Sequence, residues 1–568
     1  MPEAIIIGSG PAGSISAWEL ARAGWTVTVL ERGRNLRPGF GERPSAELGT
    51  LYSSDELKGA RQFGFPHPLL EPITGRTRAE AEAGTARSVQ GLHIQLGSAV
   101  GGTALHYNAK FPRFWQQDFH TLSALGPQAG AQVADWPIGY ADLAPFYDEV
   151  EQHIGVQGDI TRLPARTAEQ TPGRRQYPMP PNPTGYAARL LAAGAERVGY
   201  TPYPYPAAVN STGFDGRPAC NSCGLCSGFG CPINARGDAL VSYLNPAVIS
   251  GRVRVIERAL VTRIETRADG GRATGVRYLD AEGREQRLAV EKILLAASPI
   301  STARLLLLSA SAAHPRGLGN RSDQVGRNLM FHYFTLGGAF FERDVQSLRA
   351  QSTTVEVDDL VGPFSGPAIQ ALGVPWIKGG LVQVGSGLPI LAEAFFYAGL
   401  GIPHGSAHKQ AMRASLARRR IAGIQFVGED LPQAGNRVDL DPERRDWRGL
   451  PVARVTWSPH AHERAAAQYT APLLEAWLLA TPGAVGAVVT PGPLLGDAPQ
   501  NTAHHAGTAR MGEDPQTSVC DALGRLHDCP NVHVVDASSF PTFPGFNPTL
   551  TILANAQRIA RAIAQQGA

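Results

Sequence analysis

Four cysteines close together in the sequence could bind a single metal centre. Cys220, Cys223, Cys226 and Cys231 follow the spacing C-x2-C-x2-C-x4-C on a glycine-rich stretch. Thiolates at this spacing can hold an iron–sulfur cluster, because the pattern is near the bacterial ferredoxin run, although the last spacing is one residue longer. A structural zinc ion, two local disulfides or free thiols fit the same residues. The sequence leaves these alternatives open.

A glycine-rich stretch near the start of the chain has the residue types and spacing of a dinucleotide site. Gly8, Gly10 and Gly13 match G-x-G-x-x-G directly after the apolar run 4–7, which predicts a buried strand. The glycines permit a tight turn and a close approach of the backbone to a pyrophosphate. A helix expected over 14–23 would turn its free N–H groups towards the phosphates.

The residues after the glycine motif predict the rest of a strand–helix–strand unit. Gly24 is expected to end the helix, and a second strand is expected over 26–30. That strand ends at Glu31, eighteen residues after Gly13, which is close to the spacing of a carboxylate that binds a ribose hydroxyl. The complete strand–helix–strand context therefore predicts a bound dinucleotide, but it does not distinguish FAD from NAD.

Composition restricts the class of protein. The chain has 568 residues, of which 43% are hydrophobic and 18% charged, as in soluble globular proteins of more than one domain. Its net charge of +3 is too small to predict binding to nucleic acid or to an anionic membrane. No apolar run is long enough for a transmembrane helix, and glycines interrupt the apolar start, so no signal peptide is expected. These features predict a cytoplasmic protein, or a periplasmic one if a partner carries the export signal.

The regions between the two ends predict a mixture of helices and strands. An acidic helix is expected over 140–153, a buried strand over 292–296 and a core helix over 302–309. The charged alternation over 421–457 predicts antiparallel strands with one face in water. The tail over 548–564 is expected to be a helix. Nucleotide-binding segments are therefore expected at both ends, with a mixed α+β region between them.

Motifs spread along almost the whole chain resemble the glucose–methanol–choline (GMC) oxidoreductases. They are the opening glycine motif, the Gly-Gly-Thr segment 101–103, the stretch 325–332 (Val-Gly-Arg-Asn-Leu-Met-Phe-His) and the ending 547–551 (Asn-Pro-Thr-Leu-Thr). Shorter phrases are similar to a bacterial sugar and polyol dehydrogenase branch related to pyranose oxidase, namely those at 135–137, 429–432 and 507–512.

The resemblance implies a fold class and a division into domains. The implied fold is an α/β FAD-binding Rossmann-like domain of the GMC type, with an α+β substrate domain built on an antiparallel sheet. The FAD-binding domain is expected to be discontinuous and to comprise residues 1–115, 236–330 and 500–568. The substrate-binding domain is expected to comprise residues 116–235 and 331–499, with the Cys-rich loop at 220–231.

The resemblance also implies a catalytic pair. His504 resembles the catalytic histidine of the family, and Asn547 resembles its partner. A neutral histidine, with an ordinary pKa near 6.5, can take the proton of an alcohol while flavin N5 takes the hydride from carbon. Asn547 would hydrogen-bond the same oxygen. His505 is the rival base, because adjacent residues on a strand point to opposite sides and only one can face the flavin.

Further residues are implied as neighbours of the cofactor. The residues expected to contact FAD are Gly8, Gly10, Gly13, Glu31, Gly101, Gly102, His106, Val261, Asp536, Pro548 and Thr549. Within this set Val261 matches a position at the adenine, and Asp536 one near the ribityl–pyrophosphate region. His106 resembles a histidine that some members bond covalently to the flavin 8α-methyl group. The alternative is a histidine that lines the flavin pocket.

Together these expectations predict an FAD-dependent dehydrogenase that oxidises a CH–OH group of a sugar, glycoside or polyol. Electrons would leave through a cluster at the cysteines, to an electron-acceptor protein, or directly to a quinone-like acceptor, and a small export subunit is a second expected partner. The alternatives are an oxygen-using oxidase, an enzyme for a lipophilic alcohol or sterol with a pocket at 388–400, and a non-redox flavin lyase or FAD-binding scaffold.

Overall fold

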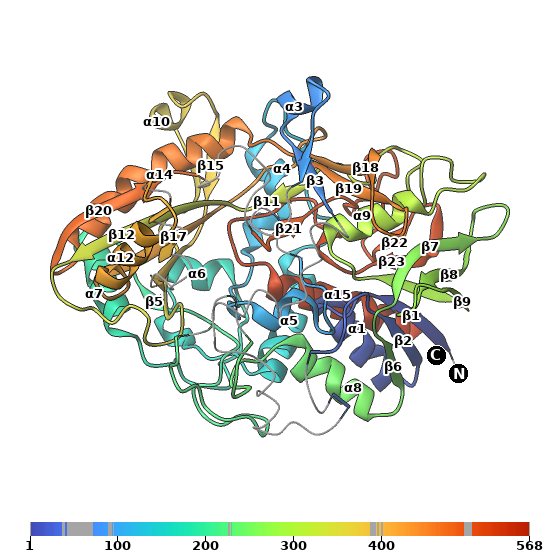
Figure 1. Ribbon diagram of the computed structural model, residues 1–568, viewed down its shortest axis with the longest axis horizontal. Coiled ribbons are helices and arrows are strands. Elements are labelled where there is room, and N and C mark those ends of the chain that lie inside the picture. The colour runs from blue at the N-terminus through green and yellow to red at the C-terminus, as the bar shows by residue number, and fades with distance from the viewer. Residues whose placement is uncertain are drawn as a thin grey trace.

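The computed structural model places a mostly parallel sheet on one side of the molecule and an antiparallel sheet on the other (Figure 1). It describes residues 2–36, 40–41, 72–88, 94, 96–224, 226, 228, 230–386, 393–394, 397–398, 401–492 and 502–566. No helix among these residues is long and apolar enough to cross a membrane.

The mostly parallel sheet joins the two ends of the chain. Its described strands are β1 (Glu3–Ile7), β2 (Thr26–Leu30), β6 (Val253–Ile256), β10 (Lys292–Leu295), β22 (Arg525–Leu526) and β23 (Cys529–Val534), in the order β22-β23-β10-β1-β2-β6. All neighbouring pairs are parallel except β22 with β23. The strands predicted over 4–7, 26–30 and 292–296 are confirmed, and β1 lies at the centre, between β2 and β10.

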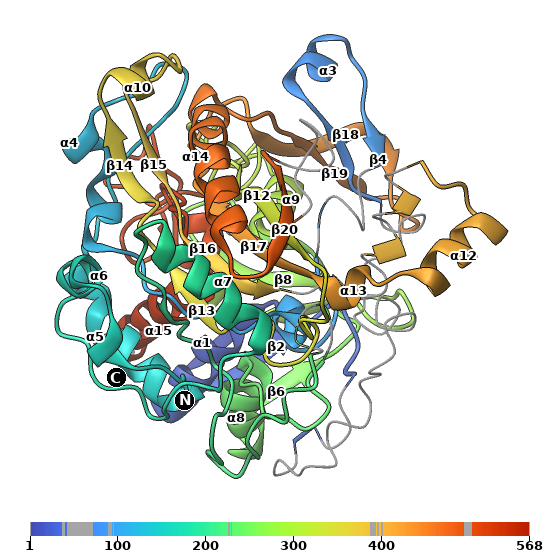
Figure 2. The ribbon, with the colours of Figure 1, turned by 90° about the vertical axis from the view of Figure 1, so that its left-hand side faces the viewer.

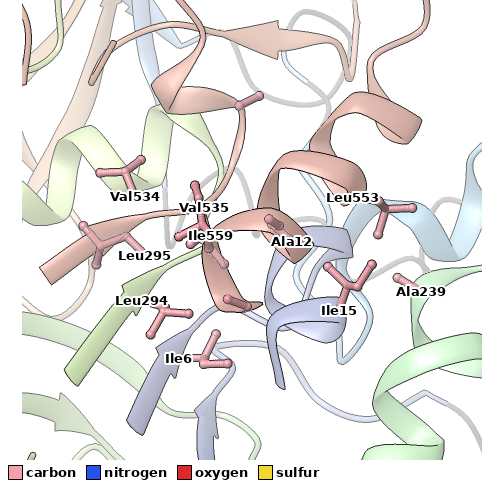
Figure 3. Packing of buried hydrophobic residues seen from close by; sticks show 14 of the residues in the cluster. Ile6, Ala12, Ile15, Ala239, Leu294, Leu295, Val534, Val535, Leu553 and Ile559 are labelled. Carbon is pink, nitrogen blue, oxygen red and sulfur yellow. The ribbon is translucent and has the colours of Figure 1, made fainter. Parts of the chain in front are cut away.

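Two helices from opposite ends of the sequence pack together against this sheet. Helix α1 (Pro11–Arg22) and helix α15 (Thr549–Gln566) lie side by side, as the close view in Figure 3 shows. Ile15 of α1 and Leu553 of α15 are buried in one core with Leu294 of β10. Burial of these apolar side chains therefore fixes the start of α15 relative to the glycine motif, although more than 500 residues separate the two in the sequence.

The antiparallel sheet has one apolar and one polar face. Its described strands are β5 (Tyr203–Pro204), β12 (Tyr333–Phe341), β13 (Val355–Val357), β16 (Val382–Ser386), β17 (Ile421–Gly428) and β20 (Ala484–Thr490), in the order β20-β12-β17-β16-β13-β5. Helices α7 (Tyr186–Arg197) and α14 (Ala461–Ala480) cover one face, as Figure 2 shows. Val382 and Val384 belong to the core beneath these helices. Because side chains alternate along a strand, Gln383 between them points to the opposite face.

Smaller sheets complete the positioning of the site. Strand β11 (Met330–Phe331) pairs with β21 (His505–Ala506), with Phe331 opposite His505. The remaining described strands are β3 (Thr74–Arg76), β4 (Arg87–Ser88), β7 (Leu260–Thr266), β8 (Ala273–Leu279), β9 (Glu285–Ala289), β14 (Val361–Ser365), β15 (Trp376–Gly379), β18 (Arg437–Arg445) and β19 (Pro451–Thr456). The other described α-helices are α3 (Arg78–Glu82), α4 (Thr121–Leu125), α5 (Tyr140–Ile154), α6 (Ala165–Gln170), α8 (Asn245–Ile249), α9 (Pro299–Leu308), α10 (Pro367–Gln370), α12 (Ser406–Ala414) and α13 (Ala417–Arg420).

The predicted fold class is confirmed: a Rossmann-like sheet with helices stands beside an antiparallel sheet. The charged alternation over 421–457 does form antiparallel strands, but β17 joins the large sheet whereas β18 and β19 pair in another. The predicted helices over 140–153 and 548–564 correspond to α5 and α15. The domain boundaries stay predictions.

Two glycines bring α1 against the sheet. Gly8 has φ +98°, and a Cβ on it would lie 2.4 Å from the Ala296 carbonyl oxygen. A Cβ on Gly13 would lie 2.0 Å from the Gly8 carbonyl oxygen. The first turn of α1 can therefore approach β1 and β10 this closely only when both positions lack a side chain.

We expect Gly13→Ala to lower the free energy of unfolding by about 1–3 kcal/mol, because the added methyl group overpacks the contact between α1 and β1. The measurement is urea unfolding of the purified protein, followed by tryptophan fluorescence. Gly10→Ala is the matched control, since a Cβ there meets no atom within 4 Å. Equal losses in the two variants would contradict the proposed steric cause.

Candidate active site

A cavity of about 510 Å³ connects the glycine motif with the histidine pair near the end of the chain. The predicted site residues that line it are Gly8, Gly10, Glu31, Gly102, His106, Val261, His504, Asp536, Asn547, Pro548 and Thr549. Gly13 and Gly101 do not line it, and both support the turns beside it. The structure thus gathers residues from both ends and the middle of the sequence around one space.

One end of the cavity has the features that a dinucleotide needs. Gly10 is the N-cap of α1 and Pro11 follows it, so the first N–H groups of the helix have no acceptor within the helix. A Cβ on Gly10 would meet no protein atom within 4 Å, so the backbone there is open to the cavity. The FAD that the family resemblance implies fits this end, because a pyrophosphate can approach the backbone and the positive helix terminus.

Glu31 lies at this end of the cavity and is held in place by protein donors. Its carboxylate accepts hydrogen bonds from the Ser9 backbone N–H at 3.0 Å, the Ser9 hydroxyl at 2.7 Å and the Gly33 N–H at 2.8 Å. A carboxylate oxygen has two lone pairs, so a ribose hydroxyl can still donate to it. Val261, on β7, lines the cavity as the predicted adenine contact.

Asp536 joins two elements at the middle of the cavity. It accepts from the Ser298 N–H at 2.9 Å and the Thr302 hydroxyl at 2.8 Å, both at the start of α9. It also accepts from the Ser538 N–H at 2.9 Å. Burial raises the pKa of Asp536, and these donors oppose that shift. Asp536 therefore positions the α9 turn, in addition to lining the space where the resemblance places the ribityl chain.

His504 and His332 form a hydrogen-bonded pair at the other end. Their Nδ1 atoms lie 2.9 Å apart, and His332 Nε2 lies 2.9 Å from the Pro544 carbonyl oxygen. The His332 ring also stacks on Phe543, with centroids 3.9 Å apart. Burial lowers the pKa of His504 to about 3, with further lowering by Lys110. Burial also holds the pKa of His332 well below its usual range.

These contacts define which nitrogen atoms carry protons. A carbonyl oxygen can only accept, so His332 donates from Nε2 and, being neutral, accepts at Nδ1. His504 must then donate from Nδ1, which leaves its Nε2 as an unprotonated acceptor. His504 lines the cavity, so the pair presents a base to whatever occupies this end.

Asn547 is oriented in a comparable way. Its Oδ1 accepts from the Tyr205 hydroxyl at 2.6 Å and from Gln383 Nε2. Both donors are buried, with exposures of 0% and 1%. Because the oxygen already has these two donors, the Nδ2 group of Asn547 is the part left for a ligand in the cavity. The site therefore offers one acceptor, on His504, and one donor, on Asn547.

His505 lines the same cavity as His504, but its side chain has other partners. Its Nε2 lies 2.8 Å from the Thr502 carbonyl oxygen, and its ring makes an edge contact with Phe331. The donation to Thr502 places the proton on Nε2, while His504 contacts His332 and Phe334. The Nε2–H group of His505 is thus used by the backbone, whereas the Nε2 atom of His504 is an acceptor.

The segment predicted to carry a flavin-linked histidine lies beside the cavity. Gly101, with φ +101°, donates its N–H to the Ser9 hydroxyl at 3.0 Å, and Gly102 approaches Gly10. His106 lines the cavity, and burial lowers its pKa to about 3, with a further contribution from Arg236. A neutral ring at this position is compatible with either role predicted for His106.

The Cys-rich loop differs from the metal prediction. Cys220, Cys223, Cys226 and Cys231 are free thiols, so the disulfide alternative is wrong. Within the described part of the chain, which omits residues 225, 227 and 229 of this loop, no three Cys, His, Asp or Glu side chains are arranged to hold a metal ion. The iron–sulfur and zinc predictions therefore find no support. Gly228 of this loop lines the cavity, and its N–H donates to the His106 carbonyl oxygen at 3.1 Å.

Sequence reasoning missed four side chains around the reacting end: Lys110, Tyr205, His332 and Gln383. His332 closes the stretch 325–332 that carries the family resemblance, but its role depends on a contact with a residue 172 positions away. The other three belong to no recognisable motif. Each of the three is a polar side chain within an apolar strand or segment. This pattern points to a site only when it is known which face of the sheet the side chain lies on. The stretch 388–400, expected to form an apolar pocket, lies mostly outside the described residues.

The whole chain is similar to proteins of one family. Two family profiles, both described as GMC oxidoreductase, match residues 5–334 and 432–556. The 2-methyl-1,2-propanediol dehydrogenase of Mycolicibacterium austroafricanum is 29% identical, over 98% of this chain and 94% of the relative. The paromamine 6'-oxidase of Streptomyces fradiae is 29% identical, over 99% and 91%. The crystal structure of pyridoxine 4-oxidase from Mesorbium loti has a TM-score of 0.63 at 18% identity and covers 99% of both chains, which shows a shared fold.

We expect His332→Phe to slow reduction of the bound flavin by substrate at least about tenfold, because His504 loses the acceptor that fixes its tautomer. Phenylalanine keeps the stacking on Phe543, so FAD content should not change. Stopped-flow absorbance at the flavin band measures the rate. His533→Phe is the matched control, since His533 is a buried histidine on β23 that does not line the cavity. An unchanged rate in His332→Phe would refute a role for the pair.

Proposed function

Because the chain belongs to the GMC oxidoreductase family, whose members bind FAD and oxidise CH–OH groups, we propose that it is a dehydrogenase of a sugar, glycoside or polyol. The observation that carries this proposal is the pairing of an acceptor nitrogen on His504 with a donor nitrogen on Asn547 in the cavity that begins at the glycine motif. The product would be the corresponding carbonyl compound.

In the proposed reaction, His504 and Asn547 have different roles at the substrate oxygen. FAD, when bound, supplies the acceptor for the hydride that leaves the substrate carbon. His504 Nε2 accepts the hydroxyl proton, and its Nδ1–H bond to neutral His332 stabilises the resulting imidazolium. Asn547 Nδ2 donates to the substrate oxygen and holds it in line with His504.

We propose that the predicted cofactor contacts bind FAD at both ends. Gly8, Gly10 and the start of α1 would hold the pyrophosphate, with Glu31 at the ribose and Val261 at the adenine. The start of α15, at Pro548 and Thr549, would meet the pyrimidine edge of the flavin, and its positive helix end suits the oxygen there. Gly102 and His106, which also line the cavity, would contact the same cofactor.

The polarity of the reacting end supports a polyhydroxylated substrate. Lys110, Gln383, Gln425 and Asn108 line the cavity, beside apolar groups such as Phe334. Side chains with several donors and acceptors can bind several hydroxyl groups at once. The similarity to a diol dehydrogenase is consistent with this substrate class.

An oxygen-using oxidase of the same substrates is the second candidate, because the paromamine 6'-oxidase is among the similar proteins. The two differ in where the electrons go, since a dehydrogenase reacts slowly with oxygen and quickly with a quinone or an acceptor protein. Peroxide formed at the rate of substrate oxidation would favour the oxidase.

A direct test is anaerobic mixing of the FAD-loaded protein with a panel of sugars, glycosides, polyols and long-chain alcohols. At least one polyhydroxylated compound should bleach the flavin, whereas bleaching by long-chain alcohols alone would overturn the proposed substrate class. His504→Ala should keep its FAD and lose about 10²–10⁴-fold in the rate of reduction, the usual contribution of a positioned base. Unchanged reduction in that variant would transfer the role of base to His505.

The pH dependence of flavin reduction gives a separate check. The folded pKa of His504 is about 3, so the ring stays neutral as the pH falls from 7 to 5 and can still accept a proton. The limiting rate of reduction should therefore show no loss centred near pH 6.5, where an exposed histidine would titrate. A fall in rate with a midpoint near pH 6.5 would contradict the burial of the base.

A further inference from the structure

A chain of buried hydrogen bonds leads from a lysine to the catalytic asparagine. Lys110 Nζ donates to Gln383 Oε1, and Gln383 Nε2 donates to Asn547 Oδ1. The three side chains are between 1% and 6% exposed, and all three line the cavity. Lys110 lies in the segment after the Gly-Gly-Thr stretch, Gln383 on β16 and Asn547 just before α15. The hydrogen bonds therefore connect three separate parts of the molecule.

The lysine sets the direction of every hydrogen bond in this chain. An amide side chain has a donor end and an acceptor end of nearly the same shape, so packing alone does not select its orientation. A lysine ammonium group has three donors and no acceptor. Gln383 must therefore turn its oxygen to Lys110 and its NH2 group to Asn547. Asn547 must in turn present its oxygen to Gln383 and its NH2 group to the cavity.

The orientation of Asn547 matters for the reaction. The substrate hydroxyl gives its proton to His504, so its oxygen gains negative charge and needs a donor. A reversed Asn547 amide would place a carbonyl oxygen against that charge and would repel it. We propose that Lys110 is a positioning residue, which acts through Gln383 to keep the NH2 group of Asn547 turned to the substrate. This inference rests on the proposed function.

The surroundings of Lys110 are compatible with this role. Burial lowers its pKa to about 7, and Glu356 and Cys226 oppose that shift. Glu356 lies directly opposite Gln383 across the pair β13–β16, on the same face of the sheet. Burial raises the pKa of Glu356 to about 8, and Lys110 opposes that shift. The ionised form of Glu356 favours the protonated form of Lys110, which is the form without a lone pair. Tyr205, whose hydroxyl also donates to Asn547, is a second support for the same amide orientation.

Two variants test the inference in different ways. Lys110→Met removes the donor and keeps a long side chain. Gln383→Glu keeps the size and position of the side chain but offers only acceptors to Asn547, so that the asparagine must reverse. In both we expect the limiting rate of flavin reduction by the substrate to fall about tenfold to hundredfold, as when a preorganised donor is lost. The substrate dissociation constant should change less than about threefold, because orientation acts mainly on the reaction step.

The matched control is Lys292→Met, at a partly buried lysine on β10 that does not line the cavity, and its reduction rate should equal that of the wild type. The decisive readout is a double-mutant cycle. In an Asn547→Ala background Lys110→Met should slow reduction by less than about twofold more, because the group through which it acts is already absent.

Failure of the proposed role of Lys110 and failure of the proposed function give different results. An unchanged rate in Lys110→Met and Gln383→Glu would overturn the inference. So would an equal fall caused by Lys110→Met in the wild-type and Asn547→Ala backgrounds, since Lys110 would then act independently of Asn547. A wild-type flavin that no alcohol or sugar reduces would overturn the proposed function itself, and the inference with it.

Discussion

The hydrogen bond between His332 and His504 is the interaction on which the reacting end of the site depends. It forms only because β11 and β21 pair in a register that sets Phe331 opposite His505. A shift of β21 by one residue against β11 would displace His504, which directly precedes β21, and turn it away from His332. The Pro544 carbonyl and the Phe543 ring then hold His332, and these lie just before Asn547 in the sequence. The short strand pair β11–β21 thus positions His504 next to His332, and the contacts of His332 with residues 543 and 544 connect this pair to the segment that carries Asn547.

The antiparallel sheet supplies the other half of the site through simple alternation. Apolar residues of β13, β16 and β17 face the core under α7 and α14, so the residues between them face away from it. Glu356, Gln383 and Gln425 are cross-strand neighbours in register and form a polar row on that second face. The same hydrophobic packing that stabilises the sheet therefore places polar groups at the cavity. Substitutions in this row alter the site without removing apolar core contacts.

The sequence was most informative where function depends on local structure. The turn at Gly8 to Gly13, the strand ending at Glu31 and the start of α15 were predictable, because each needs only a few neighbouring residues to form. The catalytic pair came from a family resemblance and could not be derived from spacing. The roles of His332, Gln383 and Lys110 were not predictable, since each depends on strand register and on segments far apart in the chain. The cysteine spacing shows the opposite error, because a regular pattern suggested a metal centre that the described residues do not form.

The low basicity of His504 bears on how it can serve as a base. Burial lowers its pKa because a positive charge on a buried ring loses its hydration, and the neighbouring Lys110 adds to that cost. The His504 ring is consequently neutral at neutral pH, so it can accept a proton, but it binds that proton only weakly. The cost falls when negative charge appears in the same cavity, since attraction between opposite charges is strong at low effective dielectric constant. In the proposed reaction, the hydride that leaves the substrate carbon carries negative charge to its acceptor in the same cavity. Proton transfer to His504 would then be favourable when it accompanies hydride transfer and unfavourable before it, so the burial of one ring would couple the two removals.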